Sequence, residues 1–142
     1  MRAYATLIKL HKARLDDKRR KLADIQRVID QMWRDVHRLE AELEAELKIS
    51  TADPKIGVMY PQYAIGNKAK REAITASIRE LERQADHARA EVNAAYQEVR
   101  KYELAKEAKQ KKIDAELDRK DRILMDEMGL ELHRRNSATS ST

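Results

Sequence analysis

The sequence predicts an all-α fold made of two long helices in an antiparallel coiled-coil hairpin, with a longer second helix and a disordered C-terminal tail. Three observations carry this prediction. Apolar residues recur every seven positions. Charged residues make up 39% of the 142 residues and aromatic residues only 4%, too few bulky groups for a thick globular core. Three Gly and two Pro leave long stretches without helix breakers.

The first helix is predicted over residues 3–48, where two heptad rows run in parallel. Such a seam buries one helix against another along its whole length. One row consists of Ile8, Leu15, Leu22, Ile29, Val36 and Leu43, and the other of Tyr4, His11, Lys18, Ile25, Met32 and Leu39.

Turn-forming residues then interrupt the period and predict a connector over residues 49–66. The connector contains Asp53, Pro54 and Gly57, and Pro61 offers an alternative start for the next helix. The second helix is predicted over residues 67–132 and the single coiled-coil domain over residues 1–135, with a disordered tail at 136–142. The second seam contains Ile74, Ile78, Leu81, Ala85, Ala88, Val92, Ala95, Val99 and Tyr102.

The two seams are most simply paired with Leu39 opposite Ile78 and Ile8 opposite Lys109, so that the numbers of paired residues add to about 117. The second helix then outruns the first by roughly 18 residues, about 27 Å. An unpaired apolar stripe of this kind usually marks an interaction site. Two parallel helices from separate chains could use the same rows and remain an alternative.

No constellation in the sequence points to catalysis, a cofactor or a metal site. The four histidines lie far apart, and there is no Cys, no phosphate-binding Gly-rich loop and no nucleophile motif. No apolar run is long enough to span a membrane, and the first ten residues lack the apolar core of a signal peptide. An enzyme is therefore not expected, and the absence of Cys is compatible with a reducing cytosol.

Two regions are predicted to bind partners. The open end of the hairpin combines cations with unpaired apolar residues, and the connector presents aromatic residues, Tyr60 and Tyr63. The cations could equally form a solvated face or meet an acidic protein surface, whereas nucleic acid is disfavoured because no aromatic residues interleave with them. The candidates at the open end are Lys9, Lys12, Arg19, Arg20, Lys21, Lys109, Lys112, Leu117, Leu124 and Met128.

Several short segments resemble the flagellar export protein FliJ family, in particular its alphaproteobacterial forms. Leu7-Ile8-Lys9-Leu10 followed by Asp17-Lys18-Arg19-Arg20 resembles the start of these proteins. The connector, with Asp53-Pro54 and Tyr60-Pro61-Gln62-Tyr63-Ala64, and the ending Met128-Gly129-Leu130 look similar as well. The likeness covers nearly the whole chain.

This resemblance implies a non-catalytic, cofactor-free stalk in the flagellar type III export apparatus, in the cytoplasm and at the membrane only peripherally. Its implied partners are the export ATPase hexamer, the cytoplasmic domain of the export gate and export chaperones, with no nucleic acid. The open-end candidates would meet the ATPase, and Tyr60 and Tyr63 would lie toward the gate.

The residues alone are also compatible with two other functions and with a stalk of a related secretion system. A prefoldin-like holdase would grip clients between apolar helix tips and would need stable oligomers. A nucleic-acid-binding arm would show affinity that falls steeply with salt. A stalk from another type III secretion system would carry the same sequence features.

Overall fold

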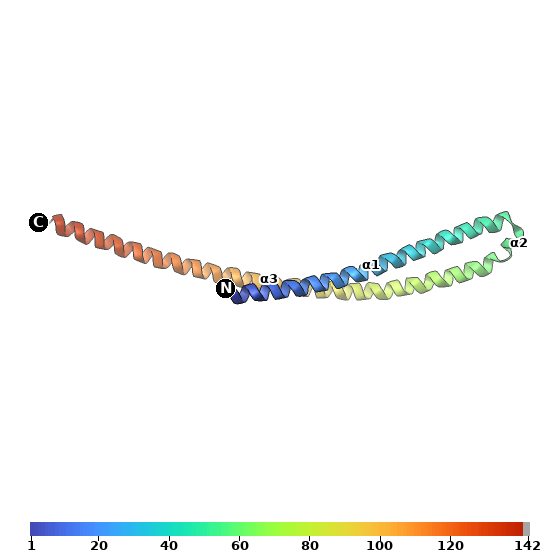
Figure 1. The fold of residues 1–142 in the computed structure, drawn as a ribbon, viewed down its shortest axis with the longest axis horizontal. Helices are drawn as coiled ribbons and strands as arrows, with labels where there is room; N and C mark the ends of the chain where they lie inside the picture. Colours follow the sequence, from blue (N-terminus) through green and yellow to red (C-terminus); the bar gives the residue numbers. More distant parts are fainter. Residues whose placement is uncertain (141–142) are drawn as a thin grey trace. The chain divides into compact units, whose positions relative to one another are not determined.

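A computed structural model describes residues 1–140, which are helical almost throughout and contain no strand (Figure 1). This confirms the all-α prediction. Helix α1 spans Arg2–Ala52, α2 spans Pro54–Gly57 and α3 spans Tyr60–Ser140. The contacts divide the chain into two compact units: unit 1 joins Met1–His11 to the part of α3 from Gln97 onward, and unit 2 covers Lys12–Tyr96. The single domain over residues 1–135 stays a prediction.

The core of unit 2 is the predicted seam between α1 and α3. Ile29 and Val36 from α1 pack with Ile78 and Ala85 from α3, all of them buried. The neighbouring seam residues are partly buried against this cluster, namely Leu22, Ile25, Met32, Ile74 and Leu81. Alanine in the α3 row lets the two backbones approach closely, so that a thin row of side chains is enough to exclude water.

The helices of unit 2 pair in a different register from the predicted one. The Asn67 side chain donates a 2.8 Å hydrogen bond from Nδ2 to the carbonyl oxygen of Leu39. Lys18 Nζ lies 2.8 Å from Glu91 Oε2. The numbers of these partners add to 106 and 109, so the pairing of Leu39 with Ile78 was wrong by more than two helical turns.

Unit 1 shows a smaller shift in the same direction. The rings of His11 and Tyr102 stack with centroids 4.8 Å apart, and Lys109 Nζ lies 5.5 Å from the ring centroid of Tyr4. The pairing of Ile8 with Lys109 was therefore wrong by one helical turn. Heptad rows look alike after each repeat, so apolar periodicity alone cannot choose between such registers.

The turn at the tip of unit 2 is shorter than the predicted connector of residues 49–66, because α1 continues to Ala52 and α3 begins at Tyr60. The alternative start of the second helix at Pro61 was thus closer to the observed start at Tyr60 than residue 67 was. Asp53 caps α2 by accepting a hydrogen bond from the Lys55 N–H, and Pro54 occupies its first turn. A Cβ at Gly57 would lie 2.9 Å from the Ser50 carbonyl oxygen, so this close approach requires glycine.

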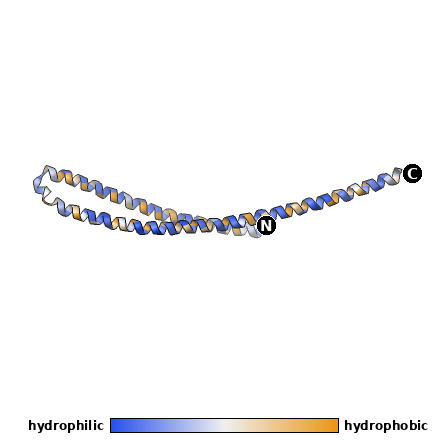
Figure 2. Cartoon of the chain, turned by 180° about the vertical axis from the view of Figure 1, so that it is seen from behind, coloured by the Kyte–Doolittle hydropathy of each residue, from blue (hydrophilic) through white to orange (hydrophobic). Residues whose placement is uncertain are grey.

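Among residues 1–140, most of the part of α3 that belongs to unit 1 has no other helix packed against it. Met1–His11 packs along the beginning of this segment (Figure 2). Residues 107–139 are all exposed. We call residues 107–139 the α3 overhang; at 1.5 Å per residue it is about 50 Å long. It exceeds the predicted length of roughly 18 residues because α3 continues past residue 132 to Ser140 and because the pairing in unit 1 is shifted by one turn. The predicted tail was also too long, since residues 136–140 are helical and Thr139 Oγ1 donates back to the Arg135 carbonyl. Residues 141–142 lie outside the described range.

Candidate functional site

The residues that the structure describes hold no group of three or more His, Asp or Glu side chains placed to bind a metal ion. None of the helices among residues 1–140 is long and apolar enough to cross a membrane. The candidate sites are exposed surfaces on helices.

The basic segment of α1, residues 9–21, presents every predicted cation to solvent. Lys9, in unit 1, and Lys12, Arg19, Arg20 and Lys21, in unit 2, are all exposed. Arg19 and Arg20 reach back to Asp16 and Asp17 at 3.9 and 3.6 Å, weak pairs on an exposed helix face. The segment therefore keeps a positive field available to an acidic surface.

Lys18 takes part in the cross-helix contact that joins α1 to α3 in unit 2. Glu91 accepts from Lys18 at one oxygen, and His87 Nε2 lies 2.8 Å from the other. The hydrogen bond from Lys18 is the main reason that the pKa of Glu91 lies below its ordinary value, with further lowering from the charges of Lys18, Lys21 and His87. The sequence placed Lys18 in a heptad row, and the structure pairs its ammonium group with Glu91 of α3.

We expect Glu91→Gln to lower the melting temperature near neutral pH and to have no effect in acid. The folded-state pKa of Glu91 lies below its unfolded value, so its contribution is complete above the unfolded pKa. This contribution is lost as the pH falls through the folded-state pKa, because Glu91 of the wild type then becomes protonated and is uncharged, like the glutamine of the variant. Thermal melts from pH 7 downward measure the difference, with the exposed Glu82→Gln as control; a gap between wild type and Glu91→Gln that does not narrow as the pH falls below 4.5 would contradict this account.

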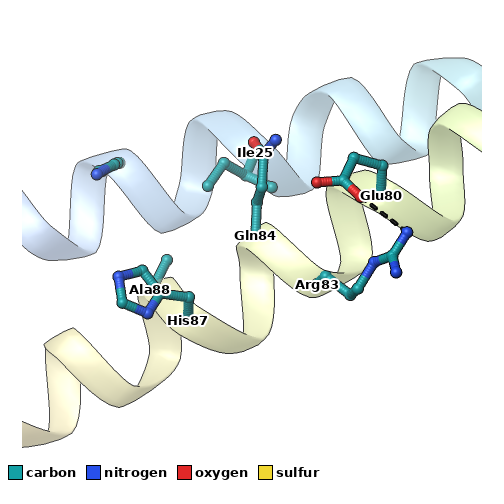
Figure 3. A pocket seen from close by; sticks show the side chains of 7 residues that line it. Ile25, Glu80, Arg83, Gln84, His87 and Ala88 are labelled. Carbon is teal, nitrogen blue, oxygen red and sulfur yellow. Dashed lines mark ion pairs between the residues drawn. The ribbon is translucent and has the colours of Figure 1, made fainter.

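A shallow groove lies on unit 2 beside this contact (Figure 3). Ile25 and the small Ala88 form its apolar part, and basic side chains border it. Arg83 bonds to Glu80 at 2.8 Å, drawn as a dashed line in Figure 3. This groove was not predicted from the sequence; the available signal was an alanine in the seam next to basic flanking residues. Its full lining is Lys21, Ile25, Glu80, Arg83, Gln84, His87 and Ala88.

The tip of unit 2 brings the two predicted tyrosines together. Tyr60 is half-buried and Tyr63 is exposed, and both line one groove with Ile56 and Met59. Val58, Met59 and Ile65 are among the most exposed large apolar side chains of the chain. Aromatic and methionine side chains supply contact area at low entropic cost, so the tip is suited to docking another protein.

The α3 overhang carries the remaining predicted residues. Leu117, Leu124 and Met128 are more than half exposed and continue the line of the α3 seam beyond Ile113. Lys112 is exposed, while Lys109 lies near Tyr4 where the overhang begins. Figure 2 shows apolar turns recurring among polar ones along this part of α3. The row is apolar surface that no other described segment covers.

The long helices, the seven-residue seam between α1 and α3 in unit 2 and the exposed apolar row of the α3 overhang are typical of an α-helical coiled-coil protein. A family model described as flagellar FliJ protein matches residues 1–138. The chain therefore belongs to the FliJ family, whose members are non-catalytic components of flagellar protein export. No curated protein and no solved structure matches the chain.

Proposed function

We propose that this protein is a non-catalytic stalk that connects the export ATPase to the export gate and assists the hand-over of export chaperones. Membership of the FliJ family supports a place in the flagellar export apparatus. The observation that carries the proposal is the α3 overhang, an exposed helix with an apolar row and no cover from the rest of unit 1.

Two surfaces would bind the ATPase in this proposal: the overhang, in unit 1, and the basic segment of α1, which lies mostly in unit 2. A single helix with an apolar row can enter the central opening of a ring and contact several subunits at once. The exposed cations of residues 9–21 would then attract acidic groups on the ring and raise the rate of association. The participating residues would be Lys9, Lys12, Arg19, Arg20, Lys21, Lys109, Lys112, Leu117, Leu124 and Met128.

The gate-binding surface in this proposal is the tip of unit 2. Tyr60 and Tyr63 line its groove, and the exposed Val58 and Met59 beside them add apolar area. A protein surface with a matching apolar ridge would bury these side chains with little loss of conformational entropy. On this proposal the protein acts in the cytoplasm and reaches the membrane only peripherally, through the apparatus.

Reversing the charge of the basic segment tests the ATPase part of the proposal. We expect Arg19→Glu, Arg20→Glu and Lys21→Glu together to weaken binding to a flagellar export ATPase by roughly 100-fold or more at low salt, with a smaller effect at high salt. Isothermal titration calorimetry measures the affinity, and circular dichroism checks that the helices persist.

A matched control reverses three exposed cations elsewhere on unit 2, Arg27→Glu, Arg34→Glu and Arg38→Glu. This control keeps the same net charge as the test variant, so a loss of binding common to both would reflect total charge alone. Unchanged binding by the Arg19, Arg20 and Lys21 variant would contradict the proposed ATPase surface.

A further inference from the structure

We propose that the α3 overhang pairs with the overhang of a second copy of this chain, forming a symmetric antiparallel dimer. The inference does not rest on the proposed function, although it uses part of the same surface.

The apolar row has the spacing of a nearly straight helix pair. Ile113 and Leu124 lie eleven positions apart, and so do Leu117 and Met128. Eleven residues make three helical turns at about 3.67 residues per turn, close to the natural period of an α-helix. These four side chains therefore stay on one side of the overhang, and all four are exposed.

One flank of the row carries charges that are complementary to themselves. Lys109, Glu116, Lys120 and Glu127 lie on this flank at alternating sign. In an antiparallel pair like flanks face each other, and placing Ile113 beside Leu124 of the second copy puts Lys109 opposite Glu127 and Glu116 opposite Lys120. The two-fold axis repeats each pair, which gives four attractive contacts.

The charges on the other flank repel each other in the dimer, but they form fewer contacts than the attractive charges on the first flank. Asp114 and Asp121 would face each other across the antiparallel pair, twice by symmetry. A parallel pair would instead set unlike flanks together, with Lys109 near Asp114 and Glu116 near Asp121, so that attraction and repulsion balance. Antiparallel pairing has two attractive contacts for each repulsive one and is therefore favoured.

Net charge and length set the strength of this dimer. Residues 107–135 contain equal numbers of acidic and basic residues, whereas the whole chain has a formal charge of +5. Two overhangs can therefore approach each other without net charge repulsion. The complementary charges span about 28 Å of helix, a short seam, so we expect reversible association that depends on concentration.

Sedimentation equilibrium of the full chain tests the proposal. We expect wild type to shift from monomer to dimer with rising concentration, and Leu117→Asp with Leu124→Asp to remain monomeric. Leu130→Asp is the matched control, because Leu130 is 58% exposed, similar to Leu117 at 55%, but lies off the row. A wild-type chain that stays monomeric at all concentrations, or that forms higher oligomers, would overturn the proposal.

A charge exchange within one chain tests the flank. Glu116→Lys or Lys120→Glu alone should raise the dimer dissociation constant about tenfold, because each places like charges opposite each other twice. The two changes combined restore both pairs by symmetry and should return the dissociation constant to near the wild-type value. Additive loss in the double variant would contradict the antiparallel arrangement.

Introduced thiols report the direction of pairing, since the chain has no cysteine of its own. A mixture of Ile113→Cys and Leu124→Cys chains should form a disulfide between unlike chains on oxidation, whereas each chain alone should not. Cross-linking of each variant to itself would indicate parallel pairing and overturn the proposal. A monomer whose overhang is protected from proteolysis only by added export ATPase would also overturn it, while supporting the proposed function.

Discussion

Replacing Ile78 by alanine is expected to lower the free energy of unfolding by about 3 kcal/mol. Ile78 is 1% exposed and belongs to the core cluster with Ile29, Val36 and Ala85. A hairpin has few such residues, so the cavity left by the missing carbons cannot be shared among many neighbours. Urea unfolding followed by circular dichroism measures the change.

The control for this prediction is Ile65→Ala on the same helix. Ile65 is 70% exposed, so its replacement should change the free energy of unfolding by no more than about 0.5 kcal/mol. Both variants gain the same helix propensity from alanine, and the difference between them therefore isolates burial. Equal losses at the two positions would show that the seam is not the main source of stability.

Introducing a larger side chain at Ala85 is expected to be almost as damaging. Ala85 is fully buried between the two helices, and Ala85→Leu adds three carbons where the backbones approach. Overpacking of this kind costs about 1–3 kcal/mol, because the helices must separate or neighbouring side chains must leave their preferred rotamers. Thermal unfolding should show a lower midpoint.

Ala94→Leu provides the comparison, since Ala94 is exposed on the same helix. It changes helix propensity in the same way and should leave the midpoint within a degree or two, as is usual for surface substitutions. An unchanged midpoint for Ala85→Leu would mean that α1 and α3 do not pack closely at this position.

The helices and the seam rows could be predicted from the sequence because both depend on local periodicity. A repeat of seven positions carries over directly into the buried face, and Ile29, Val36, Ile78 and Ala85 all lie in the predicted rows. The turn between the two helices could be predicted as well, since Asp53, Pro54 and Gly57 interrupt the seven-residue repeat between two such rows.

The register could not be predicted from apolar rows that repeat. Asn67 provides the missing information: it is 4% exposed, donates to the Leu39 carbonyl and accepts from Arg71 Nε at 2.8 Å. A buried amide with specific partners distinguishes one register from its neighbours, as polar seam residues do in other coiled coils. Its position seven residues before Ile74 was the available signal.

Two errors explain why the extent of the overhang was misjudged. The pairing in unit 1 is shifted by one helical turn, and α3 continues past the predicted end at residue 132 to Ser140, so more of α3 is uncovered and the overhang begins at Glu107. The exposed apolar residues of the overhang were identified correctly as unpaired, but its length was underestimated. The groove beside Ala88 depends on side-chain packing between the helices, which periodicity does not describe.

Site-specific photocross-linking tests the proposed stalk most directly. A photoreactive side chain placed at Leu117 or Leu124 should cross-link to the export ATPase, and one placed at Tyr63 should cross-link to the cytoplasmic domain of the export gate. Each probe position is exposed, so attachment should not disturb the fold. Cross-links to the ATPase from Tyr63 but from neither leucine would contradict the assignment of the overhang as the ATPase-binding end.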